Sequence, residues 1–503
     1  MPRQSSDRPL NIVMVSSEAV PFAKTGGLAD VVGALSVEFA KLGHHVYLII
    51  PRYPFLHLED YASEEYARFP VPTPMGPIET VVECVTYPKM SAHLTILAIR
   101  CDRFFKREGL YGESGEDYPD NLERFSYFCR AVMELLLVVH RRSAYKKAVL
   151  HLHDWQAALC AVYLRTLYAA YPELAGVRSV LTLHNIGYQG IFPGSEYWKA
   201  GLPSALFSMS SLEYYGSINL LKGGIVYAHF LTTVSPTYSR EIQSSQFGFG
   251  LEGVLSERKM FLRGIVNGID PEVWNPATDP FLASHYSLSA LKGKKQCKSH
   301  LQREVALEES DSLLIGVIAR LTSQKGLDLL VEIVPELMES DVQLVVLGTG
   351  DPSYVDHFRA LAKKYPRRVA FRDAFDESLA HRIEAGADML LMPSRYEPCG
   401  LSQLYSLRYG TVPLVRKTGG LADTVITYTP RTIKEKCATG FMFTEPTADS
   451  LLCALMVAMA VYQKRRVWLT IMKTGMKLDH SWRRSANAYV DLFREVLEEL
   501  GDK

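Results

Sequence analysis

Lys24-Thr25-Gly26-Gly27-Leu28-Ala29-Asp30 stands near the start of the chain, and the same seven residues recur as residues 417–423. Each copy follows a short apolar run and leads into helix-compatible sequence. A Gly-Gly turn between a strand and a helix lets backbone N–H groups approach a ligand at the positive end of the helix dipole. A tight turn would explain a single copy equally well. Two identical copies favour two similar domains that face one ligand, a phosphate or a polar sugar, across a cleft.

The rest of the chain alternates between strand-like and helical stretches. Strands are predicted at 11–15, 46–50, 148–152 and 179–183 in a first series, and at 313–318, 343–347, 369–372, 389–392 and 412–415 in a second. Residues 59–120 are less regular, with strands expected at 80–86 and 94–99. Such alternation predicts parallel sheets covered by helices on both faces. We therefore expect an α/β protein with two doubly wound domains, joined near residues 260–275, and a final helix at 481–500.

The composition argues against several functional classes. The 503 residues include 55 Lys+Arg and 55 Asp+Glu, and a net charge near zero argues against a nucleic acid or an anionic membrane as partner. The eight cysteines are scattered without a C-x-x-C pair, which indicates neither a zinc knuckle nor a disulfide framework. We see no signal-peptide or transmembrane pattern and expect a cytoplasmic protein. The sequence leaves the oligomeric state open.

Polar residues follow several predicted strands of the first half. Asp154 comes directly after His151-Leu152-His153, His184 ends another strand, and Asn267 lies at the expected domain join. In open α/β sheets ligands bind at the carboxyl ends of the strands, so these side chains are candidates to contact substrate. Asp154 has an alternative role as a helix cap, and Asn267 has one in a plain Asn-Gly turn. The H-x-H spacing lacks a third ligand, which argues against a metal site.

Charged residues also follow strands of the second half. Arg320 and Lys325 follow the first strand of this series, and a guanidinium with an ammonium suits a diphosphate. Taken singly, such residues are usually solvated surface charges. Glu397 lies in a loop before Gly400 and Leu401, where a carboxylate suits sugar hydroxyls and backbone N–H groups suit a phosphate. Because no D-x-D pair is present for a Mg²⁺–diphosphate complex, we predict metal-free glycosyl transfer from a sugar nucleotide.

These motifs resemble those of bacterial glycogen synthases and plant starch synthases, which extend α-1,4-glucan from ADP-glucose. The similar segments are residues 24–30, 117–125, 151–156, 182–190, 233–242, 264–270, 320–330, 392–405 and 418–425. The resemblance implies the glycosyltransferase-B fold, in which two Rossmann-like domains face a cleft. It assigns residues 1–262 and a C-terminal helix, 482–503, to an acceptor-side domain. Residues 263–481 form the nucleotide-sugar domain.

The resemblance also implies a reaction, retaining glucosyl transfer, and a catalytic set. The members of that set are Glu397, Asp154, His184, Arg320 and Lys325. In this assignment Arg320 and Lys325 bind the phosphates of the leaving ADP, and Glu397 holds the transferred glucose. Asp154 and His184 line the reaction centre. ADP-glucose is the donor substrate and α-1,4-glucan, or glycogen, is the acceptor; no metal and no cofactor are expected.

The remaining matched positions are implied to bind substrate. They are Lys24, Gly26 and Gly27 at the diphosphate; Cys399, Gly400 and Leu401 at the glucose; Tyr118, Asn267 and Lys298 nearby; and Thr418 and Gly419 on the nucleotide side. Many transferases with this fold carry a second Glu eight positions after the first, and here that position is Tyr405, as in glycogen synthases. A second departure is Cys297, where an Asn is expected before the lysine.

Two other hypotheses stay open. One is another enzyme with the same fold, such as a UDP-sugar transferase or a nucleotide-sugar epimerase. The other is a catalytically silent glucan-binding protein. The charged residues that such a protein would have lost are all present, which argues against it: Lys24, Arg320, Lys325 and Glu397. No residue distinguishes an adenine donor from a uracil donor.

Overall fold

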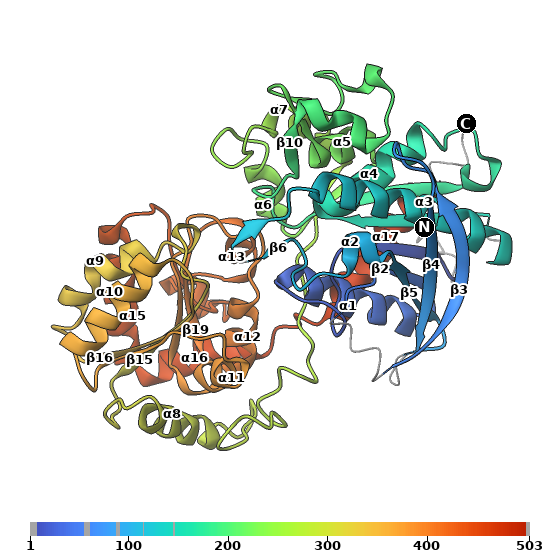
Figure 1. Ribbon diagram of the computed structural model, residues 1–503. Helices are drawn as coiled ribbons and strands as arrows, with labels where there is room; N and C mark the ends of the chain where they lie inside the picture. Colours follow the sequence, from blue (N-terminus) through green and yellow to red (C-terminus); the bar gives the residue numbers. More distant parts are fainter. Residues whose placement is uncertain (1–7, 55–60, 87–90, 114, 144–145, 499–503) are drawn as a thin grey trace. The chain divides into compact units, whose positions relative to one another are not determined.

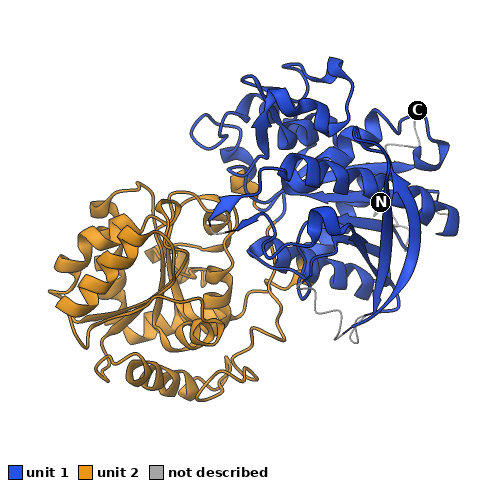
Figure 2. Cartoon of the chain, in the orientation of Figure 1, with its two compact units in different colours: residues 1–234, 239–265, 485–503 blue, residues 235–238, 266–484 orange. Residues whose placement is uncertain are grey.

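A computed structural model describes the chain except for residues 1–7, 55–60, 87–90, 114, 144–145 and 499–503 (Figure 1). The chain divides into two compact units (Figure 2). Unit 1 comprises residues 1–234, 239–265 and 485–503, and unit 2 comprises residues 235–238 and 266–484. The sequence prediction placed the boundaries after residues 262 and 481. Residues 499 and 500, the predicted end of the last helix, lie outside the described residues.

Unit 1 contains a nine-stranded sheet in the order β14-β13-β9-β8-β1-β2-β5-β4-β3 (Figure 1). Its strands, in that order, are Leu262–Gly264, Phe230–Thr233, Val177–Leu183, Ala148–His153, Asn11–Val15, His45–Pro51, Leu94–Arg100, Ile78–Thr86 and Ala62–Val71. Every pair from β14 to β5 is parallel, as predicted from the alternation of strands and helices. The predicted strands at 148–152 and 179–183 are therefore neighbours in the sheet.

One edge of this sheet differs from the expected parallel arrangement. Strands β4 and β5 pair antiparallel, and β3 adds a further antiparallel strand at the edge. The sequence analysis did not predict β3, because its first residues, Ala62 to Glu65, are exposed and carry no apolar run. Antiparallel edge strands tolerate water on one face, so this segment needs no continuous hydrophobic pattern to form a strand.

Helices cover the sheet of unit 1. The main ones are α1 (Gly27–Lys41), α3 (Asn121–Ser143), α4 (Asp154–Arg165), α5 (Leu220–Tyr227) and α17 (Trp482–Glu498). The last helix returns to the first elements of the chain: the ring of Phe493 lies 5.6 Å from Phe39 of α1 and 5.2 Å from His151 of β8. Glu495 of α17 also forms an ion pair with Arg263, at 2.8 Å.

Unit 2 contains a six-stranded parallel sheet in the order β17-β16-β15-β18-β19-β20. These strands are Val369–Arg372, Val342–Leu347, Leu313–Ile318, Met389–Met392, Val412–Arg416 and Phe441–Phe443. The main helices are α8 (Lys292–Glu304), α9 (Leu327–Leu337), α10 (Pro352–Lys364), α11 (Glu377–Gly386), α12 (Ser402–Tyr409), α13 (Gly419–Thr424), α15 (Ala448–Tyr462) and α16 (Arg465–Met476).

Both faces of the unit 2 sheet are buried. Ile315 and Val317 of β15 belong to an apolar cluster that includes residues of α9 and α15. Leu314, on the other face of the pleat, belongs to a second cluster with residues of α8 and α11. Because successive side chains of a strand point to opposite faces, a strand covered on both sides must be apolar at every position. This explains the unbroken hydrophobic run at 313–318.

The two sheets share a strand order, and this shows where the repeated heptapeptide lies. In unit 1, β1 lies between β2 and β8; in unit 2, β15 lies between β16 and β18. Strand β15 is therefore the counterpart of β1, and β19 is the counterpart of β9. The first heptapeptide follows β1, whereas the second follows β19. Two similar domains are present as predicted, but the two copies do not occupy equivalent positions.

Among the described residues, no helix has the length and apolar character needed to span a membrane.

Candidate active site

The functional candidates of unit 1 gather at the carboxyl edge of its sheet. Strands β1, β8 and β9 are neighbours and run parallel, so the segments after them leave the sheet at the same edge. Lys24 follows β1, Asp154 follows β8, and His184 follows β9. This edge is where open α/β sheets bind ligands.

Asp154 is held in an unusual conformation. Its φ of 55° is in the left-handed region, which an aspartate tolerates better than most residues. Its carboxylate accepts a hydrogen bond of 2.7 Å from the backbone N–H of His184 and another from Asn185. The side chain thus links the ends of β8 and β9 rather than capping α4, whose first residue it is. Burial raises the pKa of Asp154 to about 7, although the two amide hydrogen bonds oppose this shift.

Three histidines near this edge form a neutral cluster, in which His151 and His153 are buried and His184 is partly exposed. His153 Nδ1 lies 2.9 Å from His184 Nε2, and His151 Nε2 lies 2.7 Å from Thr182 Oγ1. Burial lowers the pKa of His151 and of His184 to about 3, and it lowers that of His153 well below its ordinary value. His184 can therefore orient a substrate group through hydrogen bonds, but it brings no positive charge at neutral pH.

The first heptapeptide presents an open turn. Lys24, Gly26 and Gly27 are exposed, and a Cβ added at either glycine would meet no atom within 4 Å. Gly26 precedes α1, a 15-residue helix whose first N–H groups have no side-chain cap. Lys24 Nζ forms an exposed ion pair of 2.8 Å with Asp30. The turn thus has the features of an anion site at a helix N-terminus.

Glu18, which the sequence analysis missed, holds this turn in place. The buried carboxylate accepts hydrogen bonds from the N–H of Thr25 (2.5 Å), the hydroxyl of Thr25 (2.8 Å) and the hydroxyl of Tyr111 (2.6 Å). A carboxylate shortly after a parallel strand is the same signal that singled out Asp154, so Glu18 was detectable from its place after residues 11–15. We infer that Glu18 is a positioning residue for Lys24.

Tyr118 has a packing role in this structure. Its ring lies near two guanidinium groups, 4.7 Å from Cζ of Arg107 and 4.9 Å from Cζ of Arg124. Its hydroxyl accepts a hydrogen bond of 3.2 Å from the N–H of Gly109. The loop that carries Tyr118 precedes α3 and contains Tyr111, the partner of Glu18. Tyr118 thus stiffens the loop beside the first heptapeptide.

In unit 2, the loops after β15 and β18 meet through a partly buried ion pair. Lys325 Nζ lies 2.7 Å from Glu397 Oε2, and the hydroxyl of Ser394 donates a 2.9 Å hydrogen bond to the same oxygen. Gly326 makes this approach possible: it has a φ of 63°, and a Cβ there would lie 2.1 Å from the carbonyl oxygen of Pro393. The sequence predictions for Lys325 and Glu397 thus converge on one place.

A cavity of about 60 Å³ opens beside this ion pair at the carboxyl ends of β15 and β18. Lys325, Glu397, Gly400 and Leu401 line it, and Leu401 directly precedes α12. Arg320 follows β15 and is exposed, and its guanidinium has no hydrogen bond or ion pair among the described residues. This edge therefore offers one carboxylate and two cations to a ligand that bears both hydroxyls and phosphates.

Cys399 and Asn267 lie together behind this loop. Both side chains are buried, and the Cys399 thiol interacts with the backbone N–H of Asn267. Burial raises the pKa of Cys399 to about 12, so the thiol is neutral and is no nucleophile at physiological pH. The Oδ1 atom of Asn267 is buried without a hydrogen-bond partner in the part of the chain that the structure describes. Asn267 is thus buried beside Cys399 rather than exposed in a surface turn.

The Gly-Gly turn of the second heptapeptide is buried, unlike that of the first. A Cβ at Gly419 would lie 1.9 Å from the carbonyl oxygen of Glu397, and φ of Gly419 is 43°. The N–H of Gly420 lies 3.2 Å from that oxygen and 3.1 Å from the carbonyl of Pro398. Thr418 is also fully buried. This turn therefore packs on the Glu397 loop and fixes its backbone, and the Gly420 N–H contacts protein where the sequence analysis expected a ligand.

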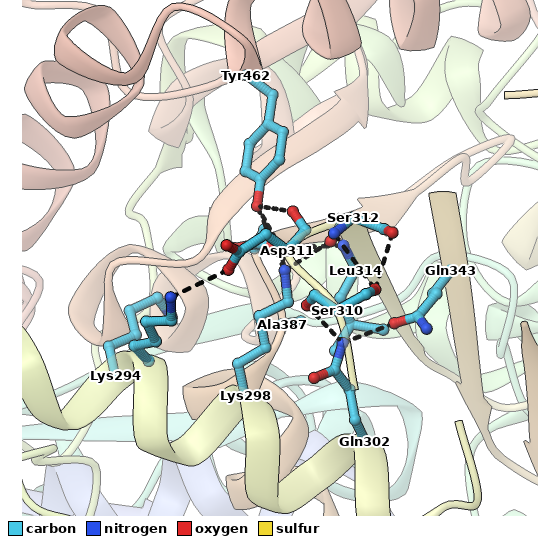
Figure 3. Close-up of polar contacts among 12 residues, drawn as sticks. Lys294, Lys298, Gln302, Ser310, Asp311, Ser312, Leu314, Gln343, Ala387 and Tyr462 are labelled. Atoms are coloured by element: carbon cyan, nitrogen blue, oxygen red, sulfur yellow. Dashed lines mark hydrogen bonds and ion pairs between the residues drawn. The ribbon is translucent and has the colours of Figure 1, made fainter. Parts of the chain in front are cut away.

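Lys298 does not lie at this edge, which corrects its predicted place near the substrate. Only 7% of Lys298 is exposed, and its Nζ lies 2.7 Å from Asp388 Oδ2 and 2.6 Å from the carbonyl oxygen of Ser312 (Figure 3). Ser312 and Asp388 precede β15 and β18, so Lys298 binds at the amino ends of the strands, opposite the Glu397 loop. Its role is to tie α8 to the sheet.

Two further residues of unit 2 have roles that the sequence did not reveal. Arg416, the last residue of β19, donates hydrogen bonds from its buried guanidinium to the carbonyl oxygens of Thr444 (3.2 Å) and of Arg395. It thereby anchors the loop that carries Glu397. Tyr405, where related transferases have a second Glu, stacks on Trp274 with ring centroids 3.6 Å apart. That position therefore contributes to packing.

No three His, Cys, Asp or Glu side chains come together to form a possible metal site within the described parts of the chain.

Two α/β units with this strand order, each with a polar cluster at its carboxyl edge, define a glycosyltransferase of the glycosyltransferase-B class. Family comparisons agree: residues 11–257 match the starch synthase catalytic domain, and residues 299–468 match glycosyl transferases group 1. A glycogen synthase of Syntrophotalea carbinolica is 44% identical over 490 residues, which cover 97% of this chain and 99% of that protein. One of Koribacter versatilis is 43% identical, with 97% and 98% covered. The chain belongs to the glycogen synthase family of glucosyltransferases.

A solved structure shares the whole fold. The catalytic domain of starch synthase IV from Arabidopsis thaliana, bound to ADP and acarbose, superimposes with a TM-score of 0.87. It is 33% identical, and the match covers 98% of this chain and 100% of that one. Sucrose-phosphate synthase from Thermosynechococcus elongatus, 17% identical with a TM-score of 0.60, shares the fold alone. The predicted fold class and family are both confirmed.

The raised pKa of Asp154 predicts a pH-dependent stability. The folded protein keeps this proton up to about pH 7, whereas an unfolded aspartate loses it near pH 4, so the free energy of unfolding falls as pH rises between these values. We expect Asp154→Asn to remove a fall on the order of 4 kcal/mol. Urea unfolding of both proteins across this pH range measures it. The same pH dependence of the unfolding free energy in both proteins would contradict the raised pKa of Asp154.

Glu18→Gln should loosen the first heptapeptide. An amide cannot accept the three hydrogen bonds from Thr25 and Tyr111 that the carboxylate accepts, and its own N–H₂ faces donors. We expect unfolding free energy to fall by about 1–3 kcal/mol and amide hydrogen exchange at residues 24–27 to speed up. Glu38→Gln, which removes only the surface ion pair with Lys41, is the control. Unchanged exchange at residues 24–27 in Glu18→Gln would rule out the positioning role.

Proposed function

We propose that this enzyme extends α-1,4-glucan from ADP-glucose by retaining transfer and without a metal ion. The observation that carries the proposal is the carboxyl edge of unit 2, where Lys325, Glu397 and the start of α12 surround one cavity beside Arg320. Glu397 suits the hydroxyls of a glucose, and the two cations suit a diphosphate. The Arabidopsis relative whose structure contains ADP supports the adenine donor.

In the proposed reaction, the 4-hydroxyl at the nonreducing end of the glucan attacks the anomeric carbon of the glucose. The new O–C bond forms on the face from which ADP leaves, and the bond from that carbon to the diphosphate oxygen breaks. The proton of the attacking hydroxyl passes to the diphosphate. Lys325 and Arg320 stabilise the charge that develops on the leaving group, so positioning and electrostatics supply the catalysis.

The groups of unit 1 are assigned to the same reaction. Lys24 and the open Gly26-Gly27 turn suit the negative charge of the diphosphate. His184, neutral at all physiological pH values, suits a sugar hydroxyl. Asp154 fixes the backbone N–H of His184 and places a carboxylate at the reaction centre, where positive charge develops on the glucose. We also propose a cytoplasmic enzyme that needs no cofactor and binds neither nucleic acid nor membrane.

The deciding experiment measures glucose incorporation into glycogen from ADP-glucose and, separately, from UDP-glucose, each with and without a chelator. We expect transfer from ADP-glucose that survives chelation, because Lys and Arg take the role that Mg²⁺ has in metal-dependent transferases. Transfer only from UDP-glucose would overturn the donor. Loss of transfer on chelation would overturn the metal-free mechanism.

Lys24→Ala tests the first heptapeptide. We expect kcat/KM for ADP-glucose to fall at least about 100-fold because one cation at the diphosphate is lost. The unfolding free energy should stay within about 0.5 kcal/mol, since the side chain is exposed in a surface ion pair. Lys41→Ala, which breaks a similar exposed pair with Glu38 on α1, is the matched control. Wild-type kcat/KM in Lys24→Ala would contradict the assignment.

A further inference from the structure

Unit 1 contains a second and larger cavity, of about 350 Å³, away from the residues assigned above. Its walls are the turn between β3 and β4 (residues 72–75), the first half of α3, and residues 198–202, which end the 3₁₀ segment Gly194–Ala200. None of the candidate active-site residues lines it. We call it the α3 cavity. Its volume is near the lower end of the range of about 300–1,000 Å³ for small-molecule sites, so it suits a ligand the size of a monosaccharide.

Aromatic side chains supply much of the wall of the α3 cavity. Phe104, Tyr127, Tyr163 and Trp198 line it. The hydroxyls of both tyrosines are already engaged, at 2.5 Å from Thr80 Oγ1 and 2.6 Å from the carbonyl oxygen of Ala200. Trp198 is half exposed, which is unusual for a side chain of its size. Aromatic walls of this kind favour a ligand with a flat apolar face, such as the C–H face of a sugar ring.

Three charged side chains line the α3 cavity, and two of them are neutralised. Glu123 pairs with Arg103 at 3.0 Å, and Lys199 pairs with Glu196 at 3.1 Å. The third, Arg130, is the exception.

The guanidinium of Arg130 has no ion pair or hydrogen bond among the described residues, and its Nε is buried. Its guanidinium lies over the rings of Tyr163, at 5.2 Å, and Tyr168, at 5.1 Å. These rings pack against the guanidinium, but its buried Nε has no acceptor. A partly buried guanidinium without an acceptor is costly, and an anionic ligand would remove that cost.

We propose that the α3 cavity binds a phosphorylated monosaccharide, with the phosphate on Arg130 and the sugar ring against Trp198. The planar guanidinium fork matches two phosphate oxygens, which explains an arginine at this position. The charge separates this ligand from a neutral glucan, which would offer Arg130 no anionic partner. The site goes beyond the proposed transfer reaction and does not depend on it.

Isothermal titration calorimetry of the full chain with glucose 6-phosphate tests the proposal. ADP is present in saturating excess throughout, so that the phosphate-binding groups of unit 2 are occupied. Titrations with maltose and with inorganic phosphate separate the contributions of the ring and the anion. The variants are Trp198→Ala, at a half-exposed position that should not affect folding, and Arg130→Lys, which keeps the charge but loses the fork.

The matched control is Arg142→Lys. Arg142 lies on the same helix and also stacks on a tyrosine, with Cζ 4.3 Å from the ring of Tyr66, but it does not line the cavity. We expect glucose 6-phosphate to bind at one site in the wild type and, with the same affinity, in Arg142→Lys. In Trp198→Ala and in Arg130→Lys its affinity should fall by at least about tenfold. Inorganic phosphate and maltose should each bind the wild type more weakly than glucose 6-phosphate does.

Three outcomes would overturn the proposal. The first is the absence of saturable binding of glucose 6-phosphate. The second is binding that neither variant weakens, which would place the ligand elsewhere. The third is maltose that binds as tightly as the phosphate and is unaffected by Arg130→Lys, which would make the α3 cavity a neutral-sugar site. Glucosyl transfer by the same preparation, assayed separately, keeps a failed binding test distinct from a failed enzyme.

Discussion

The ion pair between Lys325 and Glu397 is the interaction on which the donor-side site depends. It joins the loops after two neighbouring parallel strands, and three further features keep it in place. Gly326 lets the loops approach each other, Arg416 donates a hydrogen bond to the carbonyl oxygen of Arg395, and the second Gly-Gly turn packs on the carbonyl of Glu397. These contacts fix the positions of the Lys325 and Glu397 side chains before a ligand binds. A ligand that takes the place of one side chain therefore meets the charge of the other already in position.

In unit 2 a charged ion pair lies at the carboxyl edge of the sheet, whereas in unit 1 burial favours the neutral forms of the groups at that edge. At the ends of β8 and β9, desolvation removes charge from His151, His153 and His184 and pushes the pKa of Asp154 towards neutrality. The cations lie instead on exposed loops, as Lys24 does. The enzyme therefore combines a neutral, hydrogen-bonding interior with peripheral charge. That division suits a reaction in which a neutral sugar is transferred and a charged diphosphate departs.

The repeated heptapeptide shows how tertiary context decides the use of a local sequence. At residues 24–30 the glycines are open to solvent and Lys24 is exposed beside them. At residues 417–423 the same glycines pack against carbonyl oxygens of the Glu397 loop. The last residue differs as well: Asp30 pairs with Lys24, whereas Asp423 accepts hydrogen bonds from the N–H and hydroxyl of Thr237. Identical residues thus form an open turn in one place and a packing turn in the other.

The sequence by itself determined the alternation of strands and helices, the two α/β units, the family, and the candidates Asp154, Lys325 and Glu397. It could do so because buried parallel strands are apolar throughout and direct the loops after them to one edge of the sheet. Only the tertiary structure showed that Lys298 serves the opposite edge, that Glu18 and Arg416 hold functional loops, and that Arg130 lines a separate cavity. Those facts depend on contacts between distant segments, such as the 93 positions that separate Glu18 from Tyr111, and no local pattern records such contacts.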